Sequence, residues 1–217
     1  RHLEAKTATL IRLSGAQPDD LVVDIGCNDG TLLKSYPPTF ERCGIDPVAK
    51  KFLHFYPSDI RVVTEFFTPG LWERCFPDRQ AKIITSIAMF YDLEQPLAFM
   101  EAIHDALAPD GIWHFEQSYM PLMLQHCAYD TICHEHIEYY ALRQIHWMVA
   151  RSGMKIIELE TSTVNGGSLA VTAARKDSRH EEATAEIANL IKAEIAAGFE
   201  GMEPFWKFRD RIFQHRN

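Results

Sequence analysis

The sequence predicts an α/β fold, with a mostly parallel seven-stranded sheet, helices on both faces and a final β-hairpin. Short continuous apolar runs, typical of strands buried on both faces, alternate with stretches whose apolar residues recur at helical spacing. After five strand-and-helix units, two further apolar runs flank Asn165-Gly166-Gly167, which is typical of a hairpin. The length of 217 residues and the 47% hydrophobic content fit one complete domain and part of a second.

Seven runs are predicted to be strands, because each is short, mainly apolar and bounded by turn residues. They are residues 21–25, 42–45, 60–63, 82–85, 112–115, 156–159 and 169–172. The first run ends in Gly26, and Pro109-Asp110-Gly111 is predicted to be a turn before the fifth strand.

Helices are predicted where apolar residues recur every three or four positions. They cover residues 1–13, a short segment from Thr31 that Pro37-Pro38 ends, a segment that begins at Pro47, residues 97–107, a segment from Leu142 that Gly153 ends, and residues 182–197. The last of these presents one apolar face, made of Ile187, Leu190, Ile191 and Ile195. A further helix is predicted from Pro204, because proline is well tolerated in a first helical turn.

We divide the chain into residues 1–175, the α/β domain, and residues 176–217, the helical start of a C-terminal domain or an interface segment. The second part carries apolar residues on two neighbouring faces, which indicates a partner surface beside its contact with the domain. These residues are Phe205, Phe208 and Ile212 on one face and Trp206 and Phe213 on the other. The chain begins with Arg1 rather than Met, and its first residues already fit a helix, so we expect a piece of a longer protein.

The amino-acid composition indicates which kinds of substrate or partner the chain can bind. The 22 Lys and Arg against 30 Asp and Glu give a net charge of -8, whereas nucleic-acid binding normally needs a basic face. We therefore expect a small-molecule substrate and no nucleic acid. No apolar run is long enough for a membrane span and no secretory signal is present, so no membrane partner is predicted. The five cysteines include no Cys-x-x-Cys pair, which favours a reducing cytoplasmic setting.

The segment Asp24-Ile25-Gly26-Cys27-Asn28-Asp29-Gly30 lies between a predicted strand and a predicted helix. Gly26 lets the backbone turn sharply and a ligand come close, and Gly30 lets the helix start close to the strand. Asp46, at the end of the second strand, stands where an acid binds ribose hydroxyls in dinucleotide-type folds. The alternative is an ordinary strand-turn-helix connection, but the strand, the glycines, the helix and the later acid together favour a cofactor site.

The spacing of this segment distinguishes between cofactors. The nicotinamide fingerprint Gly-x-Gly-x-x-Gly is not met, because Asn28 and Thr31 stand at its second and third glycine positions. Asp-x-Gly-x-x-x-Gly instead resembles motif I of class I S-adenosylmethionine (SAM)-dependent methyltransferases, which have a Rossmann-like fold. The resemblance implies SAM as cofactor, with its methionyl carboxylate at the helix that follows Gly30. The expected cofactor-binding residues are Asp24, Gly26, Asn28, Gly30, Asp46, Pro47, Ser86 and Ile87.

Residues 129–140 concentrate ionisable and aromatic side chains in a predicted loop after the fifth strand, close to the cleft where ligands of open α/β sheets bind. Three interpretations remain: a structural loop, a metal site of Cys133, His134 and His136, and a general-base site. The metal interpretation is weak because no further ligands with zinc spacing are present, and no metal is predicted. In an extended segment His134 and His136 share a face and Glu135 points to the other, so spacing permits either histidine as base.

Three segments together resemble the family of SAM-dependent nucleotide-sugar C-methyltransferases that make branched deoxysugars. They are residues 24–30, His134-Glu135-His136 with the following Tyr139-Tyr140, and Asn165-Gly166-Gly167-Ser168. The resemblance covers nearly all the chain. It implies that a proton is removed beside a ketone of a nucleotide-linked sugar and that the resulting enolate attacks the SAM methyl group.

The same resemblance implies roles for individual residues. His136 corresponds to the general base and Glu135 to an orienting residue, while His134 stays a candidate by spacing. The family often has tyrosine where Cys133 stands, so Tyr91, Tyr119 or Tyr139 is expected to supply the missing hydroxyl. Family members also carry an N-terminal zinc-binding module and a further C-terminal domain, neither of which is complete in this sequence.

Two other functions use the same cofactor motif. One is O- or N-methylation of another small metabolite, and the other is a SAM-binding module without catalysis. The sequence does not specify the sugar, the methylated carbon or the oligomeric state.

Overall fold

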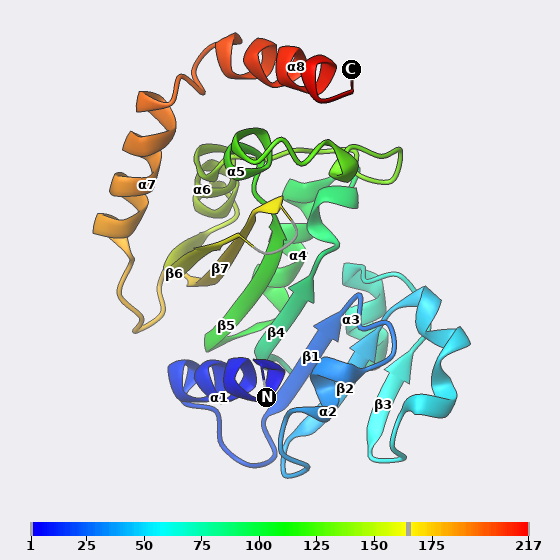
Figure 1. Cartoon of the computed structure of the whole chain (residues 1–217). Coiled ribbons are helices and arrows are strands. Elements are labelled where there is room, and N and C mark those ends of the chain that lie inside the picture. The colour runs from blue at the N-terminus through cyan, green and yellow to red at the C-terminus, as the bar shows by residue number, and fades with distance from the viewer. Residues whose placement is uncertain (1, 164–165, 217) are drawn as a thin grey trace.

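The computed structural model describes residues 2–163 and 166–216, and within them one seven-stranded sheet has the order β3-β2-β1-β4-β5-β7-β6 (Figure 1). The strands are β1 (Leu21–Ile25), β2 (Glu41–Ile45), β3 (Ile60–Val63), β4 (Ala81–Ile87), β5 (Leu107–Ser118), β6 (Met154–Ser162) and β7 (Ser168–Arg175). Neighbours from β3 to β5 are parallel, while β7 pairs antiparallel with β5 and β6. The predicted α/β class, with seven mostly parallel strands and a final hairpin, is confirmed.

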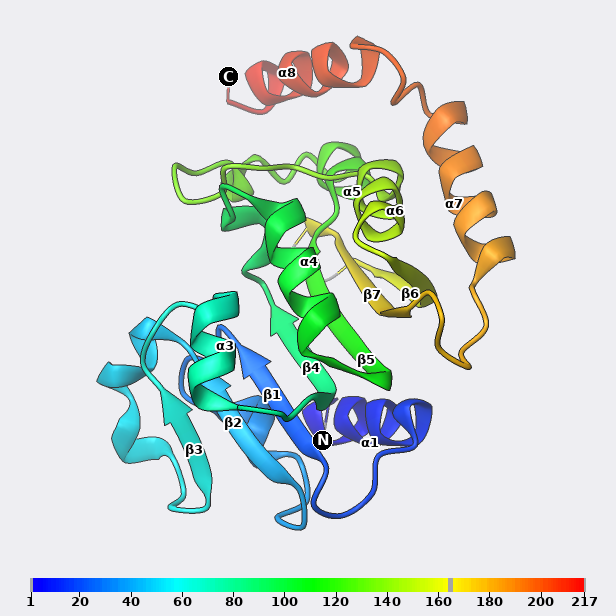
Figure 2. The same ribbon diagram turned by 180° about the vertical axis from the view of Figure 1, so that it is seen from behind.

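Helices cover both faces of the sheet, with α1 and α2 on one side and α3 and α4 on the other (Figures 1 and 2). The helices are α1 (His2–Ser14), α2 (Thr31–Lys34), α3 (Pro69–Cys75), α4 (Pro96–Ala106), α5 (Met120–Gln125), α6 (Leu142–Arg151), α7 (Thr184–Ala196) and α8 (Glu203–Arg216). Short 3₁₀ helices are η1 (Pro47–Lys51), η2 (Leu53–Phe55), η3 (Phe90–Asp92) and η4 (Tyr129–Thr131). Within β1, Val23 faces one apolar core and Val22 the other, which explains why this strand is a continuous apolar run.

Three local predictions differ from the structure. Pro109-Asp110-Gly111 is an irregularity inside β5 rather than a turn before it, because the pairing register shifts between Ala81 and Ile83 of the neighbouring strand. Pro47 begins a short 3₁₀ helix rather than an α-helix. The helices α3 and α5 were not predicted, because each is too short to produce a clear helical period.

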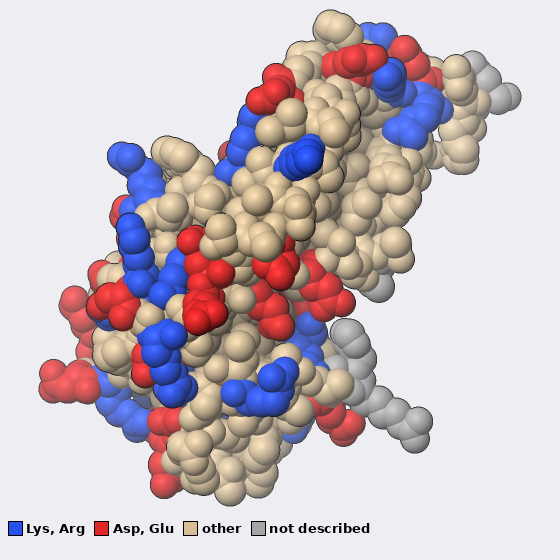
Figure 3. All heavy atoms as spheres, turned by 90° about the vertical axis from the view of Figure 1, so that its left-hand side faces the viewer, with Lys and Arg blue, Asp and Glu red and all other residues tan. Residues whose placement is uncertain are grey.

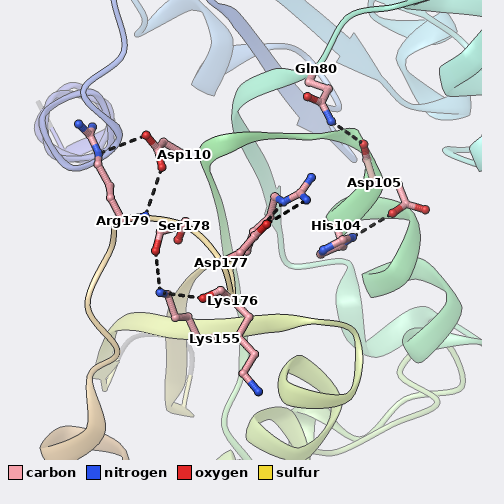
Figure 4. Close-up of polar contacts among 10 residues, drawn as sticks. Gln80, His104, Asp105, Asp110, Lys155, Lys176, Asp177, Ser178 and Arg179 are labelled. Carbon is pink, nitrogen blue, oxygen red and sulfur yellow. Dashed lines mark hydrogen bonds and ion pairs between the residues drawn. The ribbon is translucent and has the colours of Figure 1, made fainter.

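The segment after the hairpin is tied to the sheet at the end where β5 begins (Figure 4). Lys155 Nζ donates to the carbonyl oxygens of Lys176 (3.1 Å) and Ser178 (2.9 Å). The backbone N–H of Arg179 donates to Asp110 Oδ1 (3.2 Å). Residues just past the predicted boundary at residue 175 are therefore fastened to the same sheet, and the chain then turns away into α7.

The last two helices make a limited contact with the domain. Ile187 of α7 joins the main core, and Phe208 of α8 is buried against Met123 and Leu124 of α5. Trp206 and Phe213 of α8 are 56% and 58% exposed, so the predicted second partner surface stays a prediction. The predicted apolar face of α7 is partly wrong.

On α7, Ile195 is 45% exposed, whereas the adjacent Glu194 is 5% exposed. The reason is that Glu194 binds polar groups of the domain, which rotates its side of the helix inward. The pattern of apolar residues in the sequence cannot predict that this face of α7 is buried, because a hydrogen-bonded carboxylate, not an apolar side chain, is buried there.

Lys and Arg are interspersed with Asp and Glu on the side of the molecule shown in Figure 3, rather than gathered into one basic patch. In the part of the chain that the structure describes, none of the helices combines the length and the apolar character needed to cross a membrane.

Phe208 should matter far more to stability than its neighbour Trp206. We expect Phe208→Ala to lower the free energy of unfolding by about 3 kcal/mol or more, because a large buried ring leaves a cavity. Trp206→Ala should change it by roughly 0.5 kcal/mol or less, as is usual for exposed positions. Urea unfolding of both variants measures the difference. Equal losses would show that α8 does not pack through Phe208.

Candidate functional site

The loop of residues 26–30 lies at the carboxyl end of β1. Gly26 and Gly30 have φ angles of 76° and 72°, in the left-handed region that favours glycine. A Cβ atom on Gly30 would lie 2.3 Å from Cε1 of Tyr56, and one on Gly26 would lie 3.2 Å from Cγ of Met89. Both glycines are therefore required by backbone conformation, and Gly30 also by the close approach of an aromatic ring.

Asp46 connects the second strand to this loop. Its Oδ2 accepts a hydrogen bond from the backbone N–H of Asn28 (2.8 Å), and its Oδ1 accepts one from the N–H of Val48 (2.7 Å). The hydroxyl of Tyr56 donates to the carbonyl oxygen of Asn28 (2.8 Å), so the loop is held on both sides. Each carboxylate oxygen has a second lone pair, which leaves Asp46 able to accept hydroxyl groups of a ligand as well.

Asp24 lies beneath the same loop and is 4% exposed. Burial raises the pKa of this carboxyl to about 7, opposed by the hydrogen bond from Thr85 Oγ1 (2.6 Å) and assisted by the charge of Asp46. Two acids thus stand side by side at the carboxyl ends of β1 and β2. Only Asp46 is placed by its contacts to shape the surface of the loop.

The residues after β4 divide between the core and a cavity. Ser86 is fully buried and its Oγ accepts from Trp113 Nε1 (2.9 Å), so its hydroxyl is used inside the core. Ile87, Ala88 and Tyr91 instead line a cavity of about 230 Å³ at the ends of β4 and β5. Pro47, at the start of η1, is partly buried beside Asp46 and has no polar contact with the loop.

The floor of this cavity contains an ion pair that the sequence did not reveal. Glu116, from β5, accepts a hydrogen bond on Oε1 from Lys6 of α1, and His114 Nε2 lies 3.2 Å from the same oxygen. Burial lowers the pKa of His114 to about 3, assisted by the charge of Lys6, so this imidazole stays neutral. No motif marks Lys6, because its role depends on α1 packing across the sheet.

His136 is held in one orientation by its own loop. Its Nδ1 lies 2.8 Å from the carbonyl oxygen of Thr131, which can only accept, so Nδ1 carries the proton. In the neutral imidazole, Nε2 then has a free lone pair. The ring lies 4.2 Å from that of Tyr91, between centroids, and the N–H of Glu138 donates to the Tyr91 carbonyl (3.1 Å). The loop therefore brings His136 against Tyr91, which itself lines the cavity.

Other predicted residues of this loop are placed differently. Residues 132–141 form neither a helix nor a strand, and the chain bends at His134 and Glu135, so these residues do not form the straight extended segment on which the shared face of His134 and His136 depends. The side chains of His134 and Glu135 are 91% and 73% exposed, with His134 Nε2 3.9 Å from Glu135 Oε1. Among the described residues, neither side chain forms a hydrogen bond with His136 or with the residues that line the cavity.

The candidate tyrosines are also separated by the structure. The hydroxyl of Tyr119 donates to Glu194 Oε1 (2.6 Å) in the protein interior, and that of Tyr139 donates to the Thr131 carbonyl (3.3 Å). Tyr91 lines the cavity, and burial followed by the charge of Asp92 raises its pKa, so it keeps its hydroxyl proton. The structure thus brings Tyr91 and His136 together and places Tyr119 elsewhere.

Asn165 of the predicted Gly-Gly turn lies outside the described residues. Gly167 accepts a hydrogen bond on its carbonyl from the N–H of Tyr119 (3.0 Å), and a Cβ on Gly167 would lie 2.3 Å from that of Leu122. This glycine is needed so that α5 can pack closely on the turn. Among the residues that the structure describes, no group of three or more His, Cys, Asp or Glu side chains could hold a metal ion.

Two parts of the chain match known protein families. Residues 1–159 match a family described as a methyltransferase domain, and residues 163–217 match one described as a C-methyltransferase C-terminal domain. The chain belongs to the methyltransferase family. SAM is accordingly its cofactor, and the predicted class I methyltransferase fold agrees with the observed strand order.

Individual relatives support the same assignment. The C-methyltransferase NovU of Streptomyces niveus is 25% identical over 210 residues, which are 96% of this chain and 50% of that protein. The methyltransferase chain thus spans about half the length of this curated relative.

Solved structures share the fold at low sequence identity. A chain from the complex between the Haloferax volcanii Trm112 methyltransferase activator and a methyltransferase has a TM-score of 0.64 at 16% identity, covering 81% of this chain and 90% of that one. The plantazolicin methyltransferase BpumL, solved with S-adenosylhomocysteine (SAH), has a TM-score of 0.61 at 12% identity, with coverages of 80% and 83%.

Asp46→Ala should weaken SAM binding by about 1–3 kcal/mol, because it leaves the Asn28 N–H without its acceptor and removes an acceptor for ligand hydroxyls. Isothermal calorimetry measures the affinity. Glu73→Ala, on the exposed surface of α3, is the matched control and should bind SAM as the wild type does. Unchanged affinity of Asp46→Ala would remove this carboxylate from the cofactor site.

Asp24 should make stability depend on pH. Its pKa is raised, so the folded state holds a proton that the unfolded state releases between about pH 4 and about pH 7. The contribution of Asp24 to the free energy of unfolding is therefore fully present below about pH 4 and is lost as the pH rises through about 7. Asp24→Asn cannot ionise and keeps an oxygen for Thr85, so its stability relative to the wild type should increase from about pH 5 to about pH 8. Urea unfolding at the two pH values checks this, and a constant difference would contradict it.

Proposed function

We propose that this chain is the SAM-binding part of an enzyme that C-methylates a nucleotide-linked keto-deoxysugar. The observation that carries the proposal is the orientation of His136, whose Nδ1 is used by the Thr131 carbonyl and whose Nε2 lone pair is left for a substrate proton. The match of residues 163–217 to a C-methyltransferase C-terminal domain and the similarity to NovU support carbon as the methylated atom.

In the proposed reaction, Nε2 of His136 takes a proton from the carbon beside the ketone of the sugar. The electron pair of the broken C–H bond forms the enolate, whose charge lies mainly on the former ketone oxygen. The enolate carbon then attacks the SAM methyl group, and the methyl–sulfur bond breaks to leave SAH. Imidazole suits this task because its ordinary pKa lies close to neutral pH.

Two neighbours of His136 fit this role. Burial raises the pKa of Asp92, and the charge of His136 opposes that shift, so an imidazolium at His136 would be stabilised by the Asp92 carboxylate. The Tyr91 hydroxyl keeps its proton and lines the cavity, so it can donate a hydrogen bond to the enolate oxygen. Tyr91 would thereby supply the hydroxyl group that the family's tyrosine provides at the position of Cys133.

The proposed cofactor position follows from the strand ends. The methionyl carboxylate of SAM would lie against the N–H groups of residues 26–30, and the ribose hydroxyls against Asp46. Ile87 and Ala88, which line the cavity, would then border the cofactor as well, with the Lys6–Glu116 pair on the cavity floor. The negative Glu116, already partnered, suits hydroxyl groups of a sugar better than a second anion.

A methyl-transfer screen tests the proposed substrate class. The full-length protein is incubated with SAM and a panel of nucleotide-linked 4-keto sugars. Mass spectrometry and NMR then identify any methylated carbon. We expect a new carbon–carbon bond next to the ketone. A product methylated on oxygen or nitrogen would contradict C-methylation, and SAM binding without transfer to any acceptor would favour a non-catalytic module.

His136→Asn should lose turnover by about 10²–10⁴-fold, as is typical on removal of a general base, while SAM affinity stays unchanged. It should also abolish solvent deuterium exchange at the carbon beside the ketone. His134→Asn is the matched control, since His134 is exposed, and should keep both activities. Loss of both activities in His134→Asn alone would identify the neighbouring histidine as the base, and activity in both variants would make this a structural loop.

A further inference from the structure

The loop that carries His136 joins the last turn of α5 to the first turn of α6. Residues 126–141 contain only the short η4 helix, so the loop has little regular structure of its own. The two C-terminal helices, α7 and α8, lie on the outside of the domain (Figures 1 and 2). Charged side chains of these helices contact both ends of the loop.

At the end where α6 begins, the contact is the buried carboxylate of Glu194 on α7. Oε1 accepts from the backbone N–H of Leu142 (2.6 Å) and Oε2 from that of Arg143 (3.3 Å). The N-cap residue of α6 is Ala141, which has no side-chain acceptor of its own. A negative charge at a helix N-terminus is favourable, and Glu194 supplies it from a distant part of the chain.

At the end where α5 finishes, the contact is the guanidinium of Arg211 on α8. It donates to the carbonyl oxygen of Gln125 (3.0 Å) through one nitrogen and to that of Leu124 through the other. These are C-terminal carbonyls of α5, which carry partial negative charge and lack partners within the helix. The loop therefore starts at the C-terminus of α5, where the cation Arg211 binds, and ends at the N-terminus of α6, where the anion Glu194 binds.

The middle of the loop is also contacted by α8. His215 Nδ1 lies 3.3 Å from the hydroxyl of Tyr129 in η4. The apolar residues of this side of α8, including the buried Phe208, belong to the same apolar cluster as Ala141 and Tyr139 of the loop. The side of the loop that faces α8 is therefore covered by both polar and apolar contacts.

These contacts affect the orientation of His136, because His136 is hydrogen-bonded to Thr131 of the same loop. The Thr131 carbonyl, at the end of η4, accepts from His136 Nδ1 (2.8 Å) and from the Tyr139 hydroxyl (3.3 Å). If the ends of the loop move apart, η4 moves relative to residues 136–139 and this hydrogen bond is lost. Free imidazole favours the tautomer that is protonated on Nε2, in which Nε2 cannot accept a proton.

We propose that α7 and α8 form a clamp that fixes the tautomer and orientation of His136, with Glu194 and Arg211 as its positioning residues. The inference rests on the proposed role of His136 as base. It assigns to the C-terminal helices an indirect effect on catalysis, exerted through the loop that holds the base.

The test compares Arg211→Gln and Glu194→Gln with Arg209→Gln, an exposed control on the same helix that pairs only with its neighbour Asp210 among the described residues. Two-dimensional ¹⁵N NMR of the imidazoles, assigned with His136→Asn, gives the tautomer at neutral pH, and SAM binding is measured in parallel. We expect the wild type and Arg209→Gln to be protonated on Nδ1 of His136, and both clamp variants to shift towards the Nε2-protonated form. Arg211→Lys, which keeps the cation, should restore most of the wild-type signal.

With the keto-sugar acceptor found in the screen, the clamp variants should lose about tenfold to a hundredfold in kcat with little change in KM, as expected for a misplaced catalytic group. Arg211 is exposed, so its variant provides a decisive result even if Glu194→Gln fails to fold. An unchanged His136 tautomer in folded Arg211→Gln would overturn the clamp. Because the NMR readout needs no acceptor, it also separates this failure from a failure of the proposed sugar chemistry.

Discussion

The carboxylate of Glu194 joins three parts of the chain that are far apart in sequence. It receives the hydroxyl of Tyr119 at the end of β5 and the first two N–H groups of α6, while it is itself part of α7. Leaving even one such buried donor unpaired costs about 1–3 kcal/mol, so the three contacts strongly favour a single arrangement. The position of the loop between α5 and α6, and with it the position of His136, depends on this arrangement.

The two halves of the site are built in different ways. The proposed cofactor half is local: β1, the two glycines and α2 follow one another, and Asp46 and Tyr56 come from the next unit. The proposed acceptor half is assembled from Lys6, Glu116 and Tyr91, which line the cavity, and from His136, which lies against Tyr91; these residues belong to four separate segments. Such a division allows one cofactor site to serve different acceptors, because the segments that line the cavity can vary without disturbing the loop after β1.

The fold could be predicted because each strand is an apolar run and because the sheet ends in a recognisable hairpin. The tight turn of residues 26–30 could be predicted because its glycines are required by backbone geometry, as Gly30 against Tyr56 shows. The family resemblance is confirmed, whereas the roles of individual site residues stay predictions. Lys6 and Glu194 could not be found from the sequence, since a charged residue in a helix is normally solvated and only tertiary packing buries these two. The exposed position of His134 also depends on the loop conformation, which residue spacing does not determine.

In the proposed reaction, the Nε2 atom of His136 faces the carbon that is methylated. A crystal structure of the complex with SAH and a nucleotide-linked 4-keto sugar tests it most directly. We predict that His136 Nε2 lies within about 3.5 Å of the carbon beside the ketone, the reach expected for a reacting pair, with the sulfur of SAH on the opposite side of that carbon. A sugar oxygen or nitrogen facing the sulfur, with His136 away from any carbon next to the ketone, would contradict it.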